Sequence, residues 1–278
     1  MRRIIFYIFV FIAVLIGIFF YVGRINAPAD NNLQGLNWIE IFAPSSGNGI
    51  EEAMTGRKIY SGDEIMAPII LKTESSESAN IYLANGSVIR LGGNTEIELD
   101  KAVFNFKKNA LAVKIILKTG QIWSKIVGSP GDSSWEVKTD NAVVFGQVGA
   151  FGVEYSEGKT LLVVAENKAA LTVVDPEKEN NLADSTVSVS SNEIIEINDS
   201  DIEEFKIGKK TVKNFIRQES SVWQQAWISN CIIQDMVVNN KISSFKSGGL
   251  DTLEIQKALI KNNLQEMQKQ LSGRITAN

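Results

Sequence analysis

Two kinds of hydrophobic pattern divide this sequence. From Trp38 to about Ile207, short apolar-alternating runs are separated by turn residues and recur about every 8 to 12 residues. Such a series is typical of an all-β sandwich or jelly-roll-like domain. After Gly208 the apolar period lengthens to about 3.6 residues, which indicates amphipathic helices. The pattern therefore predicts a mainly β fold of about a dozen short strands followed by two amphipathic helices.

The clearest strand signal is a hairpin over residues 81–91. Two alternating runs, 81–84 and 87–91, flank the dipeptide Asn85-Gly86. Asn-Gly supplies the two positive φ angles of a type I′ turn, which matches the twist of the flanking strands. We therefore expect an antiparallel pair with positive φ at both Asn85 and Gly86.

Further strands follow the same pattern on both sides of this hairpin. We expect turns at residues 92–94, 118–120 and 166–168. The run 142–145 is apolar throughout, which is typical of a strand covered on both faces. The remaining predicted strands are 95–99, 111–117, 121–126, 135–137, 161–164, 169–174, 187–189 and 194–197.

Two helical stripes lie beyond Gly208. The first contains Val212, Phe215, Ile216, Trp223, Ala226, Trp227 and Cys231, and ends at the Ser-Gly-Gly of residues 247–249. We interpret Trp223 and Trp227 as packing against the sheet, with a partner-docking surface as the alternative. The second stripe carries a narrow seam that resembles a short coiled-coil face and indicates self-association or partner docking. Its members are Ile260, Leu264, Met267 and Leu271.

An unbroken apolar run occupies residues 4–22, directly after Arg2 and Arg3. As a helix it would span about 28 Å, close to the hydrocarbon thickness of a bilayer. The basic residues place the N-terminus inside, so residues beyond Arg24 are expected outside the cytoplasm. The predicted anchor residues include Ile4, Phe11, Leu15, Phe20 and Val22.

The anchor has an alternative interpretation as a cleaved signal peptide. Residues 27–29 read Ala-Pro-Ala, a small-x-small cleavage pattern, so the protein could be secreted after cleavage near Ala29. The apolar run is longer than usual for a signal peptide, which favours a retained anchor. The expected organisation is an anchor (1–24), a linker (25–36), a β domain (37–207) and a helical region (208–278).

Charge excludes some partners of the exported part. Arg2, Arg3 and Arg24 are three of the 28 basic residues, which leaves 25 basic against 32 acidic residues beyond the anchor. Nucleic acid and anionic lipid headgroups both need a basic face, so neither is expected as a partner.

The chain offers few groups for catalysis or metal binding. It contains no histidine, which removes Ser-His-Asp catalysis and His-ligated metal sites, and its single cysteine is Cys231. Cys231 lies in an apolar helical context, so we expect a buried, inert thiol. No catalytic, cofactor-binding or metal-binding residues are predicted, and we do not expect an enzyme.

Several short motifs occur in an order that resembles the FecR-type domain of bacterial exported proteins. They cover about residues 60–197, roughly half of the chain. At 147–149, where that family has Arg-Gly-Thr, this chain has Gln-Val-Gly. The matching positions are Gly62 and Asp63, then Asn85, Gly86 and Ser87, then Gly120 and Trp123, Trp135, and Phe151.

The resemblance implies an exported all-β module on a single membrane helix. FecR itself signals to a sigma factor through a cytoplasmic N-terminal segment, whereas only three residues precede the apolar run here. We therefore expect non-catalytic binding, scaffolding or envelope sensing, with an envelope protein or polysaccharide as partner. The alternatives are a transmembrane regulator acting through another membrane protein and, less favoured, an enzyme acting on envelope polysaccharide.

Overall fold

The computed structural model describes residues 32–34, 37–42, 50–105, 108, 110–128, 133–175, 180–209, 211–218 and 220–250, and six single positions, 254, 255, 258, 259, 261 and 265. The chain divides into two compact units, residues 1–32 and 33–278. The predicted anchor, with Ile4, Phe11, Leu15, Phe20 and Val22, lies outside the described residues. Within the described ranges, no helix has the length and apolar character needed to cross a membrane.

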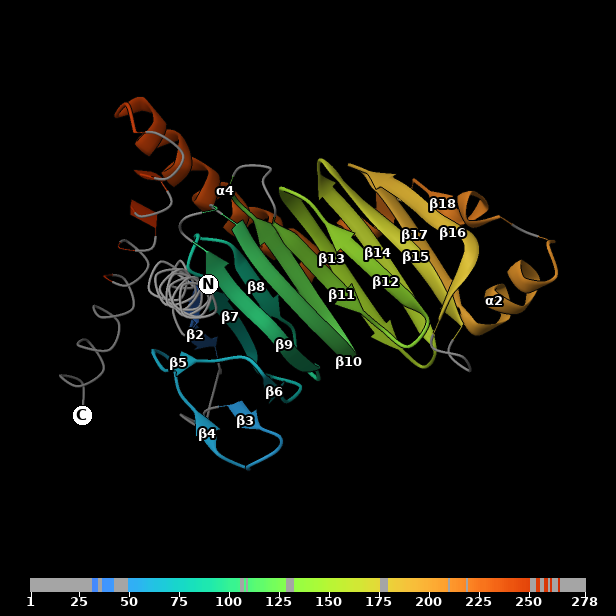
Figure 1. Cartoon of the computed structure of the whole chain (residues 1–278), viewed down its shortest axis with the longest axis horizontal. Helices are drawn as coiled ribbons and strands as arrows, with labels where there is room; N and C mark the ends of the chain where they lie inside the picture. The colour runs from blue at the N-terminus through green and yellow to red at the C-terminus, as the bar shows by residue number, and fades with distance from the viewer. Residues whose placement is uncertain are drawn as a thin grey trace, which may run out of the picture. The chain divides into compact units, whose positions relative to one another are not determined.

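The mainly β prediction is confirmed, because strands form most of the described chain (Figure 1). Two sheets share one long strand, and their described neighbours are antiparallel except for the parallel pair β10–β11. The first strand is β1 (Asn32–Gln34). The order in sheet A is β4 (Lys58–Ile59), β3 (Ile50–Glu52), β6 (Ile69–Lys72), β9 (Glu96–Asn105), β10 (Ala110–Ile126), β11 (Ser134–Lys138), β12 (Ala142–Gly146), β15 (Lys168–Asp175) and β16 (Asn180–Ser190).

Sheet B is also formed by a row of neighbouring strands, and it includes the second half of β10. Its described strands end at β18, a short strand formed by residues that the sequence pattern assigned to a helix. The order is β5 (Glu64–Ile65), β2 (Asn37–Phe42), β7 (Ser78–Tyr82), β8 (Val88–Leu91), β10, β13 (Gly149–Ser156), β14 (Lys159–Glu166), β17 (Glu193–Asn198) and β18 (Ile216–Arg217).

Strand β10 changes sheet at Gly120, where the sequence pattern predicted a turn. Residues up to Thr119 pair with β9 in sheet A, and residues from Gly120 onward pair with β13 in sheet B. Gly120 has φ +91°, and a Cβ atom there would overlap Thr95. The predicted turn is therefore wrong: a glycine bends one 17-residue strand between the two sheets.

The main hydrophobic core lies between the two sheets. It is built from the inward residues of both, including Ile39 and Ile81 of sheet B and Leu71 and Ile115 of sheet A, all with no exposed surface. The alternation of buried and partly buried residues along β9 shows the same arrangement within one strand.

The β7–β8 hairpin is confirmed, but its turn is not type I′. Gly86 has φ +86°, whereas Asn85 is not in the left-handed region. The Gly86 backbone N–H donates to the Leu83 carbonyl and the Leu83 N–H to the Ser87 carbonyl, each at 2.8 Å. The Asn85 side chain donates to the Val127 carbonyl and accepts from the Ser87 N–H. Side-chain hydrogen bonds, not a positive φ, are therefore what select asparagine here.

The single helix expected from Val212 to Cys231 is broken into shorter elements. These are η1 (Val212–Phe215), β18, α3 (Ser220–Trp223) and the long helix α4 (Ala226–Ser247). Pairing of Ile216 with Ile195 extends sheet B and outweighs the helical period there. The predicted end of the helix near residue 247 is confirmed.

A further helix, α2 (Asp199–Lys206), was not predicted. Asn198 caps it, because its side chain accepts from the Asp201 N–H while the Asp201 side chain accepts from the Asn198 N–H. This reciprocal cap was visible in the sequence and follows directly after strand β17.

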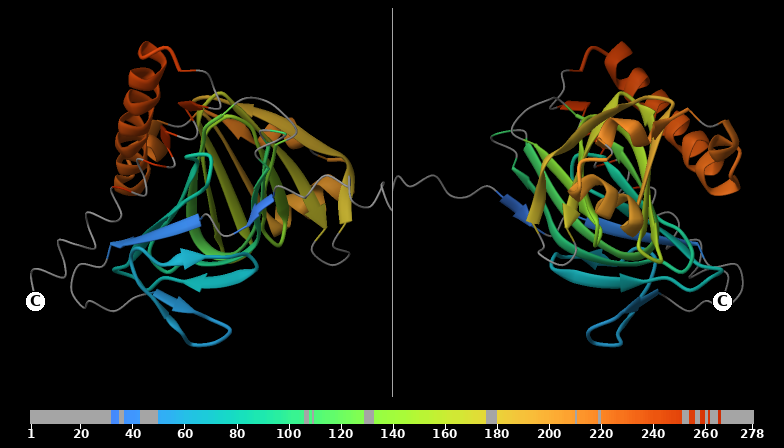
Figure 2. Two further views of the ribbon diagram at one scale, coloured as in Figure 1. Left: turned by 60° about the vertical axis from the view of Figure 1, so that its left-hand side comes forward. Right: turned by 90° about the vertical axis from the view of Figure 1, so that its right-hand side faces the viewer.

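Helix α4 packs on the outer face of sheet B (Figure 2). Ile228 and Cys231 are buried against Trp123, Val163 and Ile194 of the sheet, and Trp223 and Trp227 are partly buried beside them. Burial raises the pKa of the Cys231 thiol to about 12. The expectation of a buried cysteine is therefore confirmed.

A buried ion pair joins α4 to the sheet. An Arg90 Nη1 lies 2.6 Å from Asp235 Oδ1, and both side chains are 3% exposed. Trp123 Nε1 donates to the other Asp235 oxygen at 2.8 Å, and Arg90 Nε donates to Gln234 at 2.9 Å. Burial raises the pKa of the Asp235 carboxyl, although the Arg90 charge opposes that shift. The helix is thus held by polar as well as apolar contacts.

Candidate functional site

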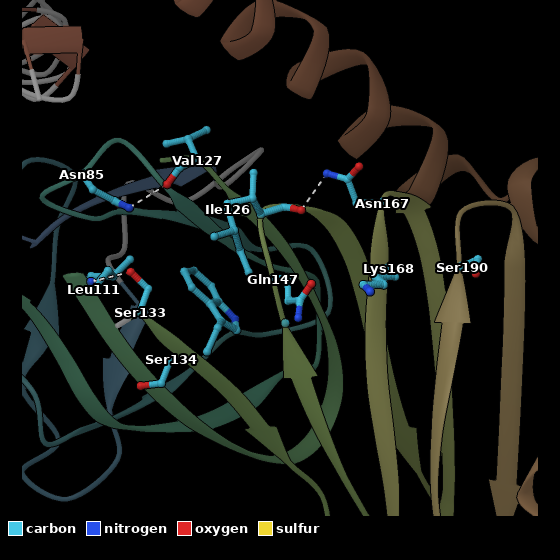
Figure 3. A pocket seen from close by; sticks show the side chains of 13 residues that line it. Asn85, Leu111, Ile126, Val127, Ser133, Ser134, Gln147, Asn167, Lys168 and Ser190 are labelled. Carbon is cyan, nitrogen blue, oxygen red and sulfur yellow. Dashed lines mark hydrogen bonds between the residues drawn. The ribbon is translucent and has the colours of Figure 1, made fainter. Parts of the chain in front are cut away.

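A cavity of about 620 Å³ opens where several turns of the two sheets meet, and we call it the end cleft (Figure 3). The turns follow β7, β12, β14 and β16. Its floor is apolar, with Leu111, Ile126 and Trp135. The buried Asn85 also lines the cavity. Its rim is polar and exposed and includes Ser133, Ser134, Gln147, Asn167, Lys168 and Ser190. An apolar floor with a few oriented polar groups is typical of ligand sites.

Hydrogen bonds fix much of the end cleft in place. Trp135 Nε1 donates to Ser124 Oγ at 3.2 Å, and the Leu111 N–H donates to Ser133 Oγ at 3.0 Å. On the rim, Asn167 donates to the Val148 carbonyl at 2.7 Å. Because these side chains are already held, the cleft needs little rearrangement to receive a ligand.

A second cavity of about 590 Å³ lies on the outer face of sheet A, and we call it the face groove. It crosses β9, β10, β11, β12, β15 and β16, which lie side by side in Figure 1. The end cleft and the face groove adjoin, because they share lining residues. These are Ser133, Ser134, Trp135, Gly146, Gln147 and Lys168.

The lining of the face groove contains more basic than acidic side chains. Three lysines, Lys101, Lys114 and Lys168, line it together with one carboxylate, Glu136. Lys114 Nζ lies 3.0 Å from Asp100 Oδ2, and this hydrogen bond and charge raise the pKa of Lys114. Within the described part of the chain, Lys101 and Lys168 have no ion-pair partner.

The structure brings only two of the predicted motif residues to this site. Asn85 and Trp135 line the end cleft, whereas the other motif residues have structural roles. Asp63 accepts from the Tyr60 N–H in the turn that contains Gly62, and Ser87 accepts from the Val127 N–H. The remaining positions form the hairpin turn (Gly86), the strand bend (Gly120), the α4 contact (Trp123) and the core (Phe151).

The two described residues of the predicted partner surface, Trp223 and Trp227, line neither the end cleft nor the face groove. Trp223 and Trp227 contact the sheet beneath α4, and Ile260, Leu264, Met267 and Leu271 lie outside the described residues. Ile255 and Leu259, which precede these four residues in the sequence, are buried beside Val127.

Sequence reasoning missed the residue at the centre of the face groove. Phe145 was expected to be covered on both sides, but its side chain is 41% exposed. The prediction of a doubly covered strand at 142–145 is therefore wrong at its last residue.

No cluster of three or more His, Cys, Asp or Glu residues capable of holding a metal ion occurs in the part of the chain that the structure describes. The carboxylate of the face groove, Glu136, is flanked in register by Lys114 and Phe145 rather than by a second acid. What the arrangement offers is surface for binding: an aromatic ring, amide and hydroxyl groups, and lysine charges.

The two sheets define a mainly β domain that carries two adjoining cavities. Residues 70–170 match the family model described as FecR protein, so the resemblance to the FecR-type domain is confirmed over these residues. Among curated proteins, none matches the chain.

Two similar solved structures come from Parabacteroides distasonis ATCC 8503, and each is described provisionally as an anti-sigma factor. Their sequence identities to this chain are 16% and 18%, with TM-scores of 0.37 and 0.36. Each comparison covers 47% of this chain and 55% of the other, so this chain spans about half the length of these structures.

Proposed function

We propose that this protein is a membrane-anchored, extracytoplasmic FecR-type module that recognises an envelope partner without catalysing a reaction. The observation that carries the proposal is the pair of adjoining cavities, the end cleft and the face groove. The size of both cavities, and the apolar floor and polar rim of the end cleft, suit a preformed ligand site. They lie on the part of the chain that matches the FecR family, or directly beside it.

The proposed location is the outer side of the bacterial cytoplasmic membrane. The apolar run 4–22 behind Arg2 and Arg3 supports a single anchor with the N-terminus inside. Secretion after cleavage near Ala29 is the alternative, and both leave the domain outside the cytoplasm.

The FecR match also favours a role in signal transduction. In this second proposal, ligand binding in the cavities changes how the anchor helix contacts another membrane protein. Recognition and signal transduction both begin with ligand binding in the end cleft and the face groove, so one binding test of these cavities applies to both.

The test is sedimentation of the purified full-length chain with the isolated cell envelope of the producing bacterium. Ala170→Trp would fill the face groove, since Ala170 lies on its surface in β15. We expect this variant to bind about tenfold more weakly, a loss of about 1.4 kcal/mol. Thr119→Trp, an exposed position on β10 that lines neither cavity, is the matched control and should bind like the unmodified chain.

Equal sedimentation of the two variants would contradict the proposal. Far-ultraviolet circular dichroism of both variants checks that an added indole has not unfolded the sheet. A bulky aromatic on an outward strand position is compatible with β structure, so folding should be retained.

A further inference from the structure

The face groove follows a single row of register partners across six strands of sheet A. At about 4.8 Å between neighbouring strands, the row extends about 24 Å, enough for several linked monosaccharide rings. Every member of the row lines the groove. In order, the partners are Lys101, Lys114, Glu136, Phe145, Ala170 and Ser188.

The middle of this row offers an open aromatic surface. Phe145 faces outward between its register partners Glu136 and Ala170, and Gly146 follows it in the groove lining. Because alanine is small, the Ala170 side of the ring has no bulky register partner. The apolar C–H face of a sugar ring can pack on such a surface, while its hydroxyl groups reach Glu136.

The charged side chains of the groove lining indicate whether a neutral or an acidic sugar binds there. Lys114 is paired with Asp100, which leaves two lysines against one carboxylate in the groove lining, whereas the whole chain has a net charge of −4. Lys101 and Lys168 lie on either side of Phe145 in strand order and form no ion pair with the described residues. A cationic groove on an acidic protein is complementary to an anionic ligand and steers it to this face.

The strand pairing disfavours an extended peptide as the occupant. A peptide commonly binds a sheet by pairing with an unpaired strand edge. Under the groove, β10, β11, β12 and β15 are each paired on both sides. The groove therefore offers side chains, not backbone groups, to its ligand.

We propose that the face groove binds a chain of an acidic polysaccharide, with one sugar ring on Phe145 and acidic groups on Lys101 and Lys168. This assignment rests on the proposed function and names its ligand class. Hydroxyl groups of neighbouring sugars bond to Glu136 and Ser188 along the same row.

The test is calorimetric titration of the purified full-length chain with hexagalacturonate, neutral maltohexaose and hexaglutamate. We expect hexagalacturonate to bind at least about tenfold more tightly than either control. Lys101→Ala with Lys168→Ala should weaken this binding about tenfold and reduce its salt dependence, since two charge contacts are lost. Phe145→Ala should weaken it about fivefold.

Matched controls lie on exposed positions away from the groove. Lys209→Ala removes a comparable surface charge, and Phe42→Ala removes an aromatic ring that is 45% exposed. Neither should change the affinity. Equal binding of hexaglutamate would identify an acidic peptide as the ligand class, and equal binding of maltohexaose would show that charge does not matter; either result overturns the assignment.

Comparing the calorimetric titration with the sedimentation assay separates this inference from the proposed function. If hexagalacturonate does not bind while sedimentation with envelopes still depends on Ala170, the acidic polysaccharide assignment fails and the recognition site stands. If sedimentation is also independent of Ala170, the proposed function fails with it.

Discussion

Replacing Asp235 with asparagine should release helix α4 from sheet B. Asp235 and Arg90 are both 3% exposed and lie 2.6 Å apart, so the substitution leaves a buried guanidinium without its counter-charge. Breaking such a pair from one side costs about 3–5 kcal/mol. Asparagine keeps the size of the side chain and an oxygen for the Trp123 N–H, so a packing defect does not explain the loss.

The double replacement Arg90→Met with Asp235→Leu separates the cost of an unpaired buried charge from the loss of packing between α4 and sheet B. Because burial raises the pKa of Asp235, keeping this carboxylate ionised inside the protein carries a cost at neutral pH. An apolar pair of similar volume avoids that cost, so the double variant should be about as stable as the unmodified chain. Lys58→Met, which breaks an exposed pair with Glu51, should change stability by less than about 1 kcal/mol.

The assay is urea unfolding of the full-length variants, followed by tryptophan fluorescence, because Trp123, Trp223 and Trp227 lie at this contact. Asp235→Asn should unfold at a clearly lower urea concentration, and the α4 signal should change first. An unfolding curve for Asp235→Asn that coincides with that of Lys58→Met would refute the view that the ion pair holds α4.

Three further predictions concern topology, backbone and thiol chemistry. A cysteine introduced by Ser46→Cys should react with a membrane-impermeant maleimide in intact cells, and labelling only after lysis would reverse the orientation. Gly120→Ala should destabilise the chain by about 2 kcal/mol or more, because its positive φ and the approach of Thr95 both resist a Cβ; Gly56→Ala, with open space around it, should cost about 1 kcal/mol. The Cys231 thiol, with its pKa raised to about 12, should resist alkylation at pH 8 until urea is added. The unfolded thiol ionises at a lower pH than the folded one. The stabilisation from this group is therefore fully present below the ordinary pKa near 9 and declines as the pH rises toward 12. Rapid labelling of the native chain would show that the contact between α4 and sheet B does not bury this residue.

Local patterns in the sequence predicted the strands better than the connections between them. Alternation identified the β7–β8 hairpin and most other strands, because one face of each is buried in the core. The bend at Gly120 was read as a turn, since a glycine that moves a strand between sheets has the same local sequence signal as one that ends it. The turn at Asn85 was assigned from backbone preference, but a long-range bond to Val127 determines the residue there.

The face groove could not be predicted from one sequence. Its row joins strands from Lys101 to Ser188, and the register that aligns them depends on five separate pairings. A shift of one residue in any pairing would turn the row inward, and no local pattern fixes the register. Asn85 and Trp135 were found because they belong to short motifs, whereas Phe145 has an unremarkable apolar context.

Hydrogen–deuterium exchange of the full-length chain, with and without the solubilised polysaccharide fraction of the envelope, tests the central claim most directly. Backbone amides of β11, β12 and β15 and of the turns around Gln147 and Asn167 should exchange more slowly when the ligand is present. Helix α4, on the outer face of sheet B, should be unchanged. Protection confined to α4, or to no part of the described chain, would contradict the assignment of the end cleft and the face groove as the recognition site.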